Sequence, residues 1–270
     1  MYASITLSIM SSDCVFGIRA FDSYLRVECD NVRLRNMLHR YILPPLPRCD
    51  ASCVAPDISI QAMQSPDSFQ ILVDGQRVAS AITIDDAVLE VVKAVDDALI
   101  KRFKSLRAVH AGAIVLRDKA LIIPGTSHAG KSSLVAELLR RGATHLSDEY
   151  ALIDSLGRIH AYPRPLLLRN GSPKQSPMLP EELTSSFATG PVSVAWIFAI
   201  EYSPGAEWEI RRLSQGEAVM LLLRNTPHEM EHTPGMVDSF LALAANAECY
   251  QGKRGEAGKA ADQILRLVTR

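Results

Sequence analysis

The sequence predicts an α/β fold, with a small N-terminal α/β unit over residues 1–104 and a larger α/β domain over residues 105–270. Residues 125–132 read GTSHAGKS, a phosphate-binding pattern that lies between an apolar strand-like segment and an amphipathic helix-like segment. Upstream, Asp74 and Gly75 separate two alternating segments, which is typical of a β-hairpin. Strands and helices are therefore expected in both parts of the chain.

The N-terminal unit shows local signals for strands, a hairpin and two helices. Helical spacing over residues 30–43 ends at a proline cluster, Pro44, Pro45 and Pro47. Thr83, followed by Asp86, predicts the start of a second helix that keeps one apolar face to about Phe103. We expect strands at 3–9, 24–29, 57–63, 68–73 and 76–83. No motif with chemical meaning occurs in this unit, which either covers the core domain or recognises a partner.

The larger domain begins with two apolar strands around a turn at Arg117, Asp118 and Lys119. The second strand runs directly into GTSHAGKS, and an amphipathic helix with Gly142 as its stop follows. Ser214 and Glu217 form a capping box for a later helix. We expect strands at 106–116, 120–125, 144–153, 192–200 and 207–213, and helices at 131–142, 214–223, 235–246 and 256–268.

Composition narrows the class of partner and the compartment. The net charge of −1 argues against nucleic acid and against an anionic membrane as partners. No apolar run approaches the roughly 20 residues that cross a bilayer, and no Lys or Arg precedes Arg19 as in a signal peptide. The odd count of five cysteines fits reduced thiols, and Cys49 with Cys53 lacks a second ligand pair for zinc. We therefore expect a cytoplasmic protein.

The phosphate-binding pattern is complete, because each position supplies what a phosphate requires. Gly125 and Gly130 let the backbone curl so that N–H groups point inward, and the helix N-terminus adds partial positive charge. Lys131 can reach β- and γ-phosphates, and Ser132 offers a hydroxyl to Mg²⁺. A chance match in a strand–turn–helix is the alternative. The expected phosphate-binding residues are Gly125, Thr126, Ser127, His128, Ala129, Gly130, Lys131, Ser132 and Ser133.

Two acids follow the loop early, after one short helix and one strand. Asp148 and Glu149 lie between apolar residues, which fits a strand end better than a solvated turn. We expect this strand to bring both acids to the phosphates. His110 lies on the strand before the loop. A single strand histidine is usually structural, although here it could contact a phosphate or a carboxylate.

These features together resemble the C-terminal domain of the HPr kinase/phosphorylase family, over roughly residues 105–175. The matching residues are His110, Gly125 to Ser132, and Ser147-Asp148-Glu149. The resemblance implies a P-loop kinase core that uses ATP and Mg²⁺ to phosphorylate serine. It also implies Asp148 as general base, Lys131 and His110 at the phosphates, and Ser132, Asp148 and Glu149 around Mg²⁺. The family tends to oligomerise, so a homo-oligomer is allowed.

The chain departs from the family pattern at three places. His128 replaces a glycine of the loop, and Glu149 replaces an aspartate. Residues 162–174 read YPRPLLLRNGSPK where the family carries its dephosphorylation signature. The departures indicate a kinase-only branch without phosphorylase activity. Kinases of lasso-peptide precursors are such a branch, and their acceptor is a peptide serine.

Further candidates and two other functions stay open at this stage. Arg164, Arg169 and Arg224 could stabilise transferring phosphate charge, or be surface residues at the ends of elements. His228 and His232 do not form a metalloprotease motif, and their segment could bind an acceptor. The alternatives to a peptide or small-protein serine kinase are a nucleotide-binding regulatory module and a kinase of a small-molecule hydroxyl.

Overall fold

The structure is a computed structural model, and it describes residues 15–21, 23–42, 48–49, 55–126, 129–169, 175–230 and 234–269. The expected strand at 3–9, the proline stop, Cys14, Cys53, Ser127, His128 and His232 lie outside the described residues. The chain forms two compact units, Met1–Arg102 and Phe103–Arg270, which are described separately. Both units combine strands with helices, so the expected α/β class is correct.

In its described residues, the first unit is a sheet with two helices. The strands follow the order β3-β1-β2-β4-β5-β6, with β2 and β4 parallel and the other pairs antiparallel. The predicted hairpin joins β5 to β6, and Asp74 and Gly75 take positive φ angles of 49° and 78°. Bounds are β1 Val15–Ala20, β2 Ser23–Cys29, β3 Arg48–Cys49, β4 Ile58–Ser65, β5 Ser68–Val73, β6 Gln76–Ala81, α1 Val32–Tyr41 and α2 Ile84–Ile100.

The helices of the first unit begin where their caps predict. The Asn31 side chain accepts a hydrogen bond from the backbone N–H of Leu34, at 2.9 Å. Thr83 caps α2 by accepting from the backbone N–H of Asp86 at 3.2 Å, as the sequence indicates. One face of α2 is apolar and buried.

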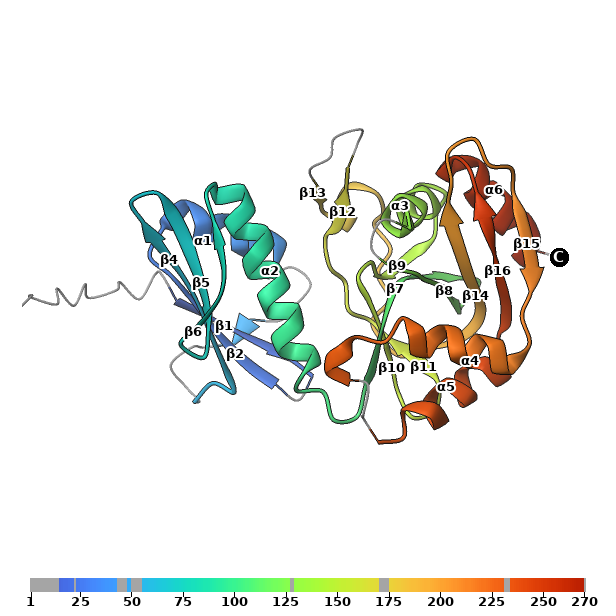
Figure 1. The fold of residues 1–270 in the computed structure, drawn as a ribbon, viewed down its shortest axis with the longest axis horizontal. Coiled ribbons are helices and arrows are strands. Elements are labelled where there is room, and N and C mark those ends of the chain that lie inside the picture. The colour runs from blue at the N-terminus through green and yellow to red at the C-terminus, as the bar shows by residue number, and fades with distance from the viewer. Residues whose placement is uncertain are drawn as a thin grey trace, which may run out of the picture. The chain divides into compact units, whose positions relative to one another are not determined.

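The second unit is a mixed sheet covered on both faces by helices (Figure 1). Its strands follow the order β11-β10-β7-β8-β14-β16-β15, and β9 pairs with β7. The central strands β8, β14 and β16 are parallel. Bounds are β7 Arg107–Leu116, β8 Lys119–Pro124, β9 Thr144–Ser147, β10 Tyr150–Ile153, β11 Arg158–His160, β14 Val192–Tyr202, β15 Glu209–Arg212 and β16 Glu248–Arg254.

Two apolar layers hold the helices onto this sheet. Helices α3 (Lys131–Arg140) and α6 (Ala257–Val268) share one buried cluster with the sheet, and α4 (Gln215–Arg224) and α5 (Met236–Ala245) share another. Ser214 and Glu217 form the predicted capping box of α4. The short strands β12 (Leu166–Leu168) and β13 (Ser176–Met178) form a separate ribbon.

The sequence predictions need correction at the strand that carries the acids and at strands that were not predicted. The expected continuous strand at 144–153 is two strands, β9 and β10, because the chain bends at Asp148 and Glu149. The sequence prediction also omitted several strands, β1, β3, β11, β12, β13 and β16. The residues of β16 alternate in burial without a continuous apolar pattern. No helix in the described part of the chain is long and apolar enough to span a membrane.

Candidate functional site

The phosphate-binding pattern lies where the central strand β8 gives way to α3. The backbone N–H of Gly125 donates to the carbonyl of His110 on the neighbouring strand, at 3.2 Å. Gly130 is the N-cap of α3 with φ of 81°, a conformation that favours glycine. The N-terminus of α3 therefore points its free N–H groups at the end of the loop. Ser127 and His128 fall outside the described residues.

Lys131 curls back over the loop that precedes it. Its Nζ donates to the carbonyl oxygen of Thr126 at 3.0 Å, and only 9% of the residue is exposed. Burial lowers the pKa of Lys131, and the nearby charges of Glu149 and Asp148 oppose this effect. A compact cation thus lies beside the loop and close to two acids, as a phosphate-binding lysine would.

Asp148 lies at the bend between β9 and β10, and only 1% of it is exposed. It accepts hydrogen bonds from the Ser132 side chain and from the backbone N–H of Leu167. Its second oxygen, Oδ1, is buried and has no hydrogen-bond partner among the described residues. Desolvation raises the pKa of Asp148 from 3.8 to about 7, although Ser132 and Lys131 act in the opposite direction. The carboxyl group is therefore poised to exchange a proton near neutral pH.

Gly112 on β7 makes the approach of α3 to this acid possible. A Cβ at position 112 would collide with the Val135 side chain of α3 and would lie 3.7 Å from Asp148 Oδ1. The absent side chain thus lets the first turns of α3 lie directly against the strand. Sequence reasoning missed Gly112, because its signal is only an isolated glycine within a strand pattern.

His110 and Glu149 form the more open part of the site. His110 Nδ1 lies 3.5 Å from Glu149 Oε1, and about a third of each side chain is exposed, 35% and 36%. The His110 ring also packs on Tyr150, its direct partner across β7 and β10, with ring centroids 4.6 Å apart. His110 thus lies in contact with a carboxylate.

Arg254 and Tyr202 support the loop from the side of β14 and β16. Arg254 Nη2 donates to the carbonyl of Gly130 at 2.7 Å, and only 2% of Arg254 is exposed. The Tyr202 backbone N–H donates to the carbonyl of Ala129 at 3.2 Å. Sequence reasoning missed both residues, since neither belongs to a motif and both act across long chain separations.

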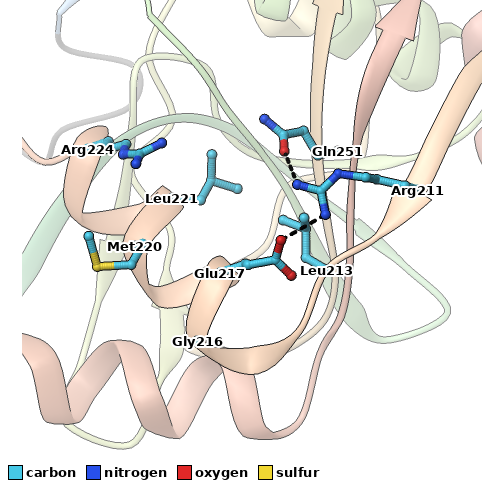
Figure 2. Close-up of a pocket in the computed structure, with 8 residues that line it drawn as sticks. All are labelled: Arg211, Leu213, Gly216, Glu217, Met220, Leu221, Arg224 and Gln251. Carbon is cyan, nitrogen blue, oxygen red and sulfur yellow. Dashed lines mark hydrogen bonds and ion pairs between the residues drawn. The ribbon is translucent and has the colours of Figure 1, made fainter.

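The remaining candidates lie apart from this cluster or have other partners. Arg164 is almost fully buried, with its guanidinium 5.6 Å from the Tyr162 ring centroid. Arg224 lines a pocket of about 400 Å³, whose lining does not include Lys131 or Asp148 (Figure 2). Ser133 and His228 are exposed, and Arg169 is partly buried. The described residues contain no group of three or more His, Cys, Asp or Glu arranged for a metal.

Comparison with known proteins adds little to this geometry. No protein-family model and no curated protein matches the chain significantly. Among solved structures, the chain resembles the Hpr(Ser) kinase/phosphatase from Coxiella burnetii, with 14% identity and a TM-score of 0.35. That likeness covers 60% of this chain and 88% of the other. A TM-score of this size carries no argument, so the function must be argued from the site.

Proposed function

We propose that this chain is an ATP- and Mg²⁺-dependent kinase of the HPr kinase type, which transfers a γ-phosphate to a serine hydroxyl of a peptide or small protein. The observation that carries the proposal is the position of Asp148, a buried carboxyl that lies beside Ser132 and Lys131 at the end of the phosphate-binding loop. The raised pKa of Asp148 supports the same role. A general base is most effective when its pKa lies near the working pH. A nucleotide-binding module without transfer has no need of such a base.

The residues present fit a nucleotide-bound Mg²⁺. Mg²⁺ is held through one or two carboxylates together with substrate phosphates and water, all of them oxygen ligands. The unpartnered Oδ1 of Asp148 and the Ser132 hydroxyl are such donors, and Glu149 is partly exposed beside them. The absence of a three-acid cluster among the described residues agrees with a metal that phosphates help to hold. Mg²⁺ would neutralise charge on the phosphates.

The chain's own residues supply the rest of the reaction. The loop N–H groups and Lys131 hold the phosphates, which is most of what phosphoryl transfer requires. Asp148 accepts the proton of the serine hydroxyl as the serine oxygen bonds to the γ-phosphorus. The bond between that phosphorus and the bridging oxygen of ADP breaks, and the electron pair stays on ADP. His110 positions Glu149 at the open side of the site.

The choice of acceptor rests on the motif resemblance and on no pocket of the structure. The motif resemblance favours a serine of a precursor peptide, as in the lasso-peptide branch. Under this proposal, residues 1–104 recognise the peptide, while a small-molecule hydroxyl is the alternative acceptor. No oxygen ligand or base in the site separates these acceptors, so the experiment must do so.

The test is transfer from ATP to an arrayed library of serine peptides that includes C-terminal serines, read by mass spectrometry. We expect a gain of one phosphate on a subset of peptides. Asp148→Asn should abolish transfer while ATP still binds, and Lys131→Ala should weaken ATP binding itself. Asp118→Asn, an exposed aspartate in the turn between β7 and β8, is the matched control. ATP binding without transfer to any peptide or to free serine would support the regulatory module instead.

A further inference from the structure

The loop-bearing strand divides the candidate site into two sides. In the sheet order, β7 and β10 lie on one side of β8, and β14 and β16 lie on the other. Asp148, Glu149 and His110 belong to the first side, because β9 and β10 both pair with β7. In phosphoryl transfer the attacking and leaving oxygens lie roughly in line. A nucleoside that leaves opposite the base Asp148 must therefore extend toward the ends of β14 and β16.

An aromatic residue is exposed at that position. Tyr202 ends β14, and 39% of it is exposed although its backbone N–H is bonded to Ala129 of the loop. A Cβ built on Gly130 would lie 3.0 Å from the Tyr202 Cβ, so this ring begins directly beside the first turn of α3. The buried guanidinium of Arg254 lies 5.3 Å from the ring centroid. The ring is thus held at the loop with part of its surface open to solvent.

A pocket of about 410 Å³ adjoins the same arginine. The turn between β14 and β15 and the beginning of α6 form its walls, and Arg254 is part of the lining. Trp208 gives it an aromatic wall, and Glu256, Lys259 and Gln263 give it hydrogen-bonding groups of both signs. Aromatic surface with a few donors and acceptors is what a heterocyclic base and a ribose require.

We propose that Tyr202 and this pocket form the nucleoside subsite of the phosphate-binding loop. The base stacks on the exposed part of the Tyr202 ring, and the polar groups of the pocket bind the edge of the base or the ribose. This inference rests on the proposed function, since it assumes that the loop holds the phosphates of a nucleotide. It predicts contacts to the nucleoside part of the nucleotide, and their effect on nucleotide binding can be measured without any acceptor.

The experiment compares two probes, ATP and inorganic tripolyphosphate, by calorimetry in the presence of Mg²⁺. Tyr202→Ala should weaken ATP binding by about fivefold to a hundredfold, the range found when a stacking aromatic is removed. Tripolyphosphate affinity should change by less than about twofold, because the loop contact uses the backbone of residue 202. Tyr202→Phe, which keeps the ring, should restore most of the ATP affinity.

A second variant tests the pocket, and a third serves as the control. Gln263→Trp places a bulky side chain in the pocket lining, so it should weaken the binding of ATP but not that of tripolyphosphate. Leu241→Ala, on an exposed position of α5, should bind both probes as the wild type does. The inference is overturned if Tyr202→Ala weakens the binding of ATP and of tripolyphosphate equally, or if it weakens the binding of neither.

The outcomes separate this inference from the kinase proposal. Wild-type protein that binds neither probe would overturn the phosphate site, and the nucleoside subsite with it. ATP binding that depends on Tyr202, without phosphate transfer to any acceptor, would support the subsite and contradict the kinase. Phosphate transfer that depends on Asp148, with an ATP affinity unchanged by Tyr202→Ala, would support the kinase and contradict the subsite.

Discussion

Replacing Asp148 by Asn should stabilise the second unit at neutral and alkaline pH. The carboxyl is buried, and its pKa is raised from 3.8 to about 7, mainly by desolvation. Between these two values the folded state keeps a proton that the unfolded state has released, so stability falls as pH rises through this window. Above about pH 7 both states are ionised and the penalty is constant. The amide introduced by Asp148→Asn does not titrate, and its oxygen can still accept a hydrogen bond from Ser132.

The magnitude follows from the size of the pKa shift. About three pKa units correspond to about 4 kcal/mol at 1.36 kcal/mol per unit. The gain in unfolding free energy of Asp148→Asn over wild type should therefore be about 1–2 kcal/mol at about pH 5 and about 4 kcal/mol at about pH 8. The change of this difference with pH isolates the effect of the carboxyl group, since other effects of the substitution are largely the same at both pH values.

The assay is urea unfolding followed by tryptophan fluorescence, with a chelator present. The chain has two tryptophans, Trp196 and Trp208, and both belong to the second unit, so the signal reports on that unit alone. Asp118→Asn is the control, and its difference from wild type should not depend on pH. A difference for Asp148→Asn that is flat or shrinks from pH 5 to pH 8 would refute the reasoning, because the carboxylate would then be ionised at little cost.

Gly130→Ala, with Gly142→Ala for comparison, tests the support of the loop, and His145→Phe tests a buried histidine on β9. Gly130→Ala should lower the unfolding free energy by about 1–3 kcal/mol and weaken tripolyphosphate binding, because φ at Gly130 is 81° and the new Cβ would lie 2.5 Å from Arg254 Nη2. Gly142→Ala is the comparison: φ at Gly142 is 90° but its Cβ would meet no atom, so this variant shows the cost of backbone strain without a collision. His145 is buried and its pKa is lowered to about 4 by desolvation, so its contribution to stability is lost as pH falls from about 6.5 toward 4. His145→Phe should remove about 3 kcal/mol of this acid sensitivity, and an unchanged acid transition would contradict the assignment.

Local signals predicted the parts of the fold that local physics determines. The hairpin at Asp74 and Gly75 and the caps at Thr83 and Ser214 need only their own neighbours, and the structure contains all of them. The loop between β8 and α3 also follows from consecutive residues, since its glycines permit the turn into the helix. These elements could be read from short windows of the chain.

The support of the site could not be predicted in this way. Arg254 reaches Gly130 across a separation of 124 residues, and it lies on a strand without a clear apolar pattern. Asp148 accepts a hydrogen bond from the backbone of Leu167, and Gly112 allows α3 to lie close to it, and no spacing in the sequence encodes either contact. The pKa of Asp148 is thus a property of the folded unit, although the residue itself was predicted from its position.

The two neighbouring acids lie in different environments, which fits the base role that the resemblance gives to Asp148 alone. Asp148 is buried and bonded to Ser132, whereas Glu149 is about a third exposed and lies beside His110. When adjacent acids occupy such different environments, the more desolvated one is the better proton acceptor. Ionising the buried Asp148 carboxyl costs desolvation free energy. A hydrogen-bond donor or a cation at Oδ1 would offset part of that cost. The cost in stability and the reactivity proposed for Asp148 therefore have the same physical origin, the desolvation of one carboxyl group.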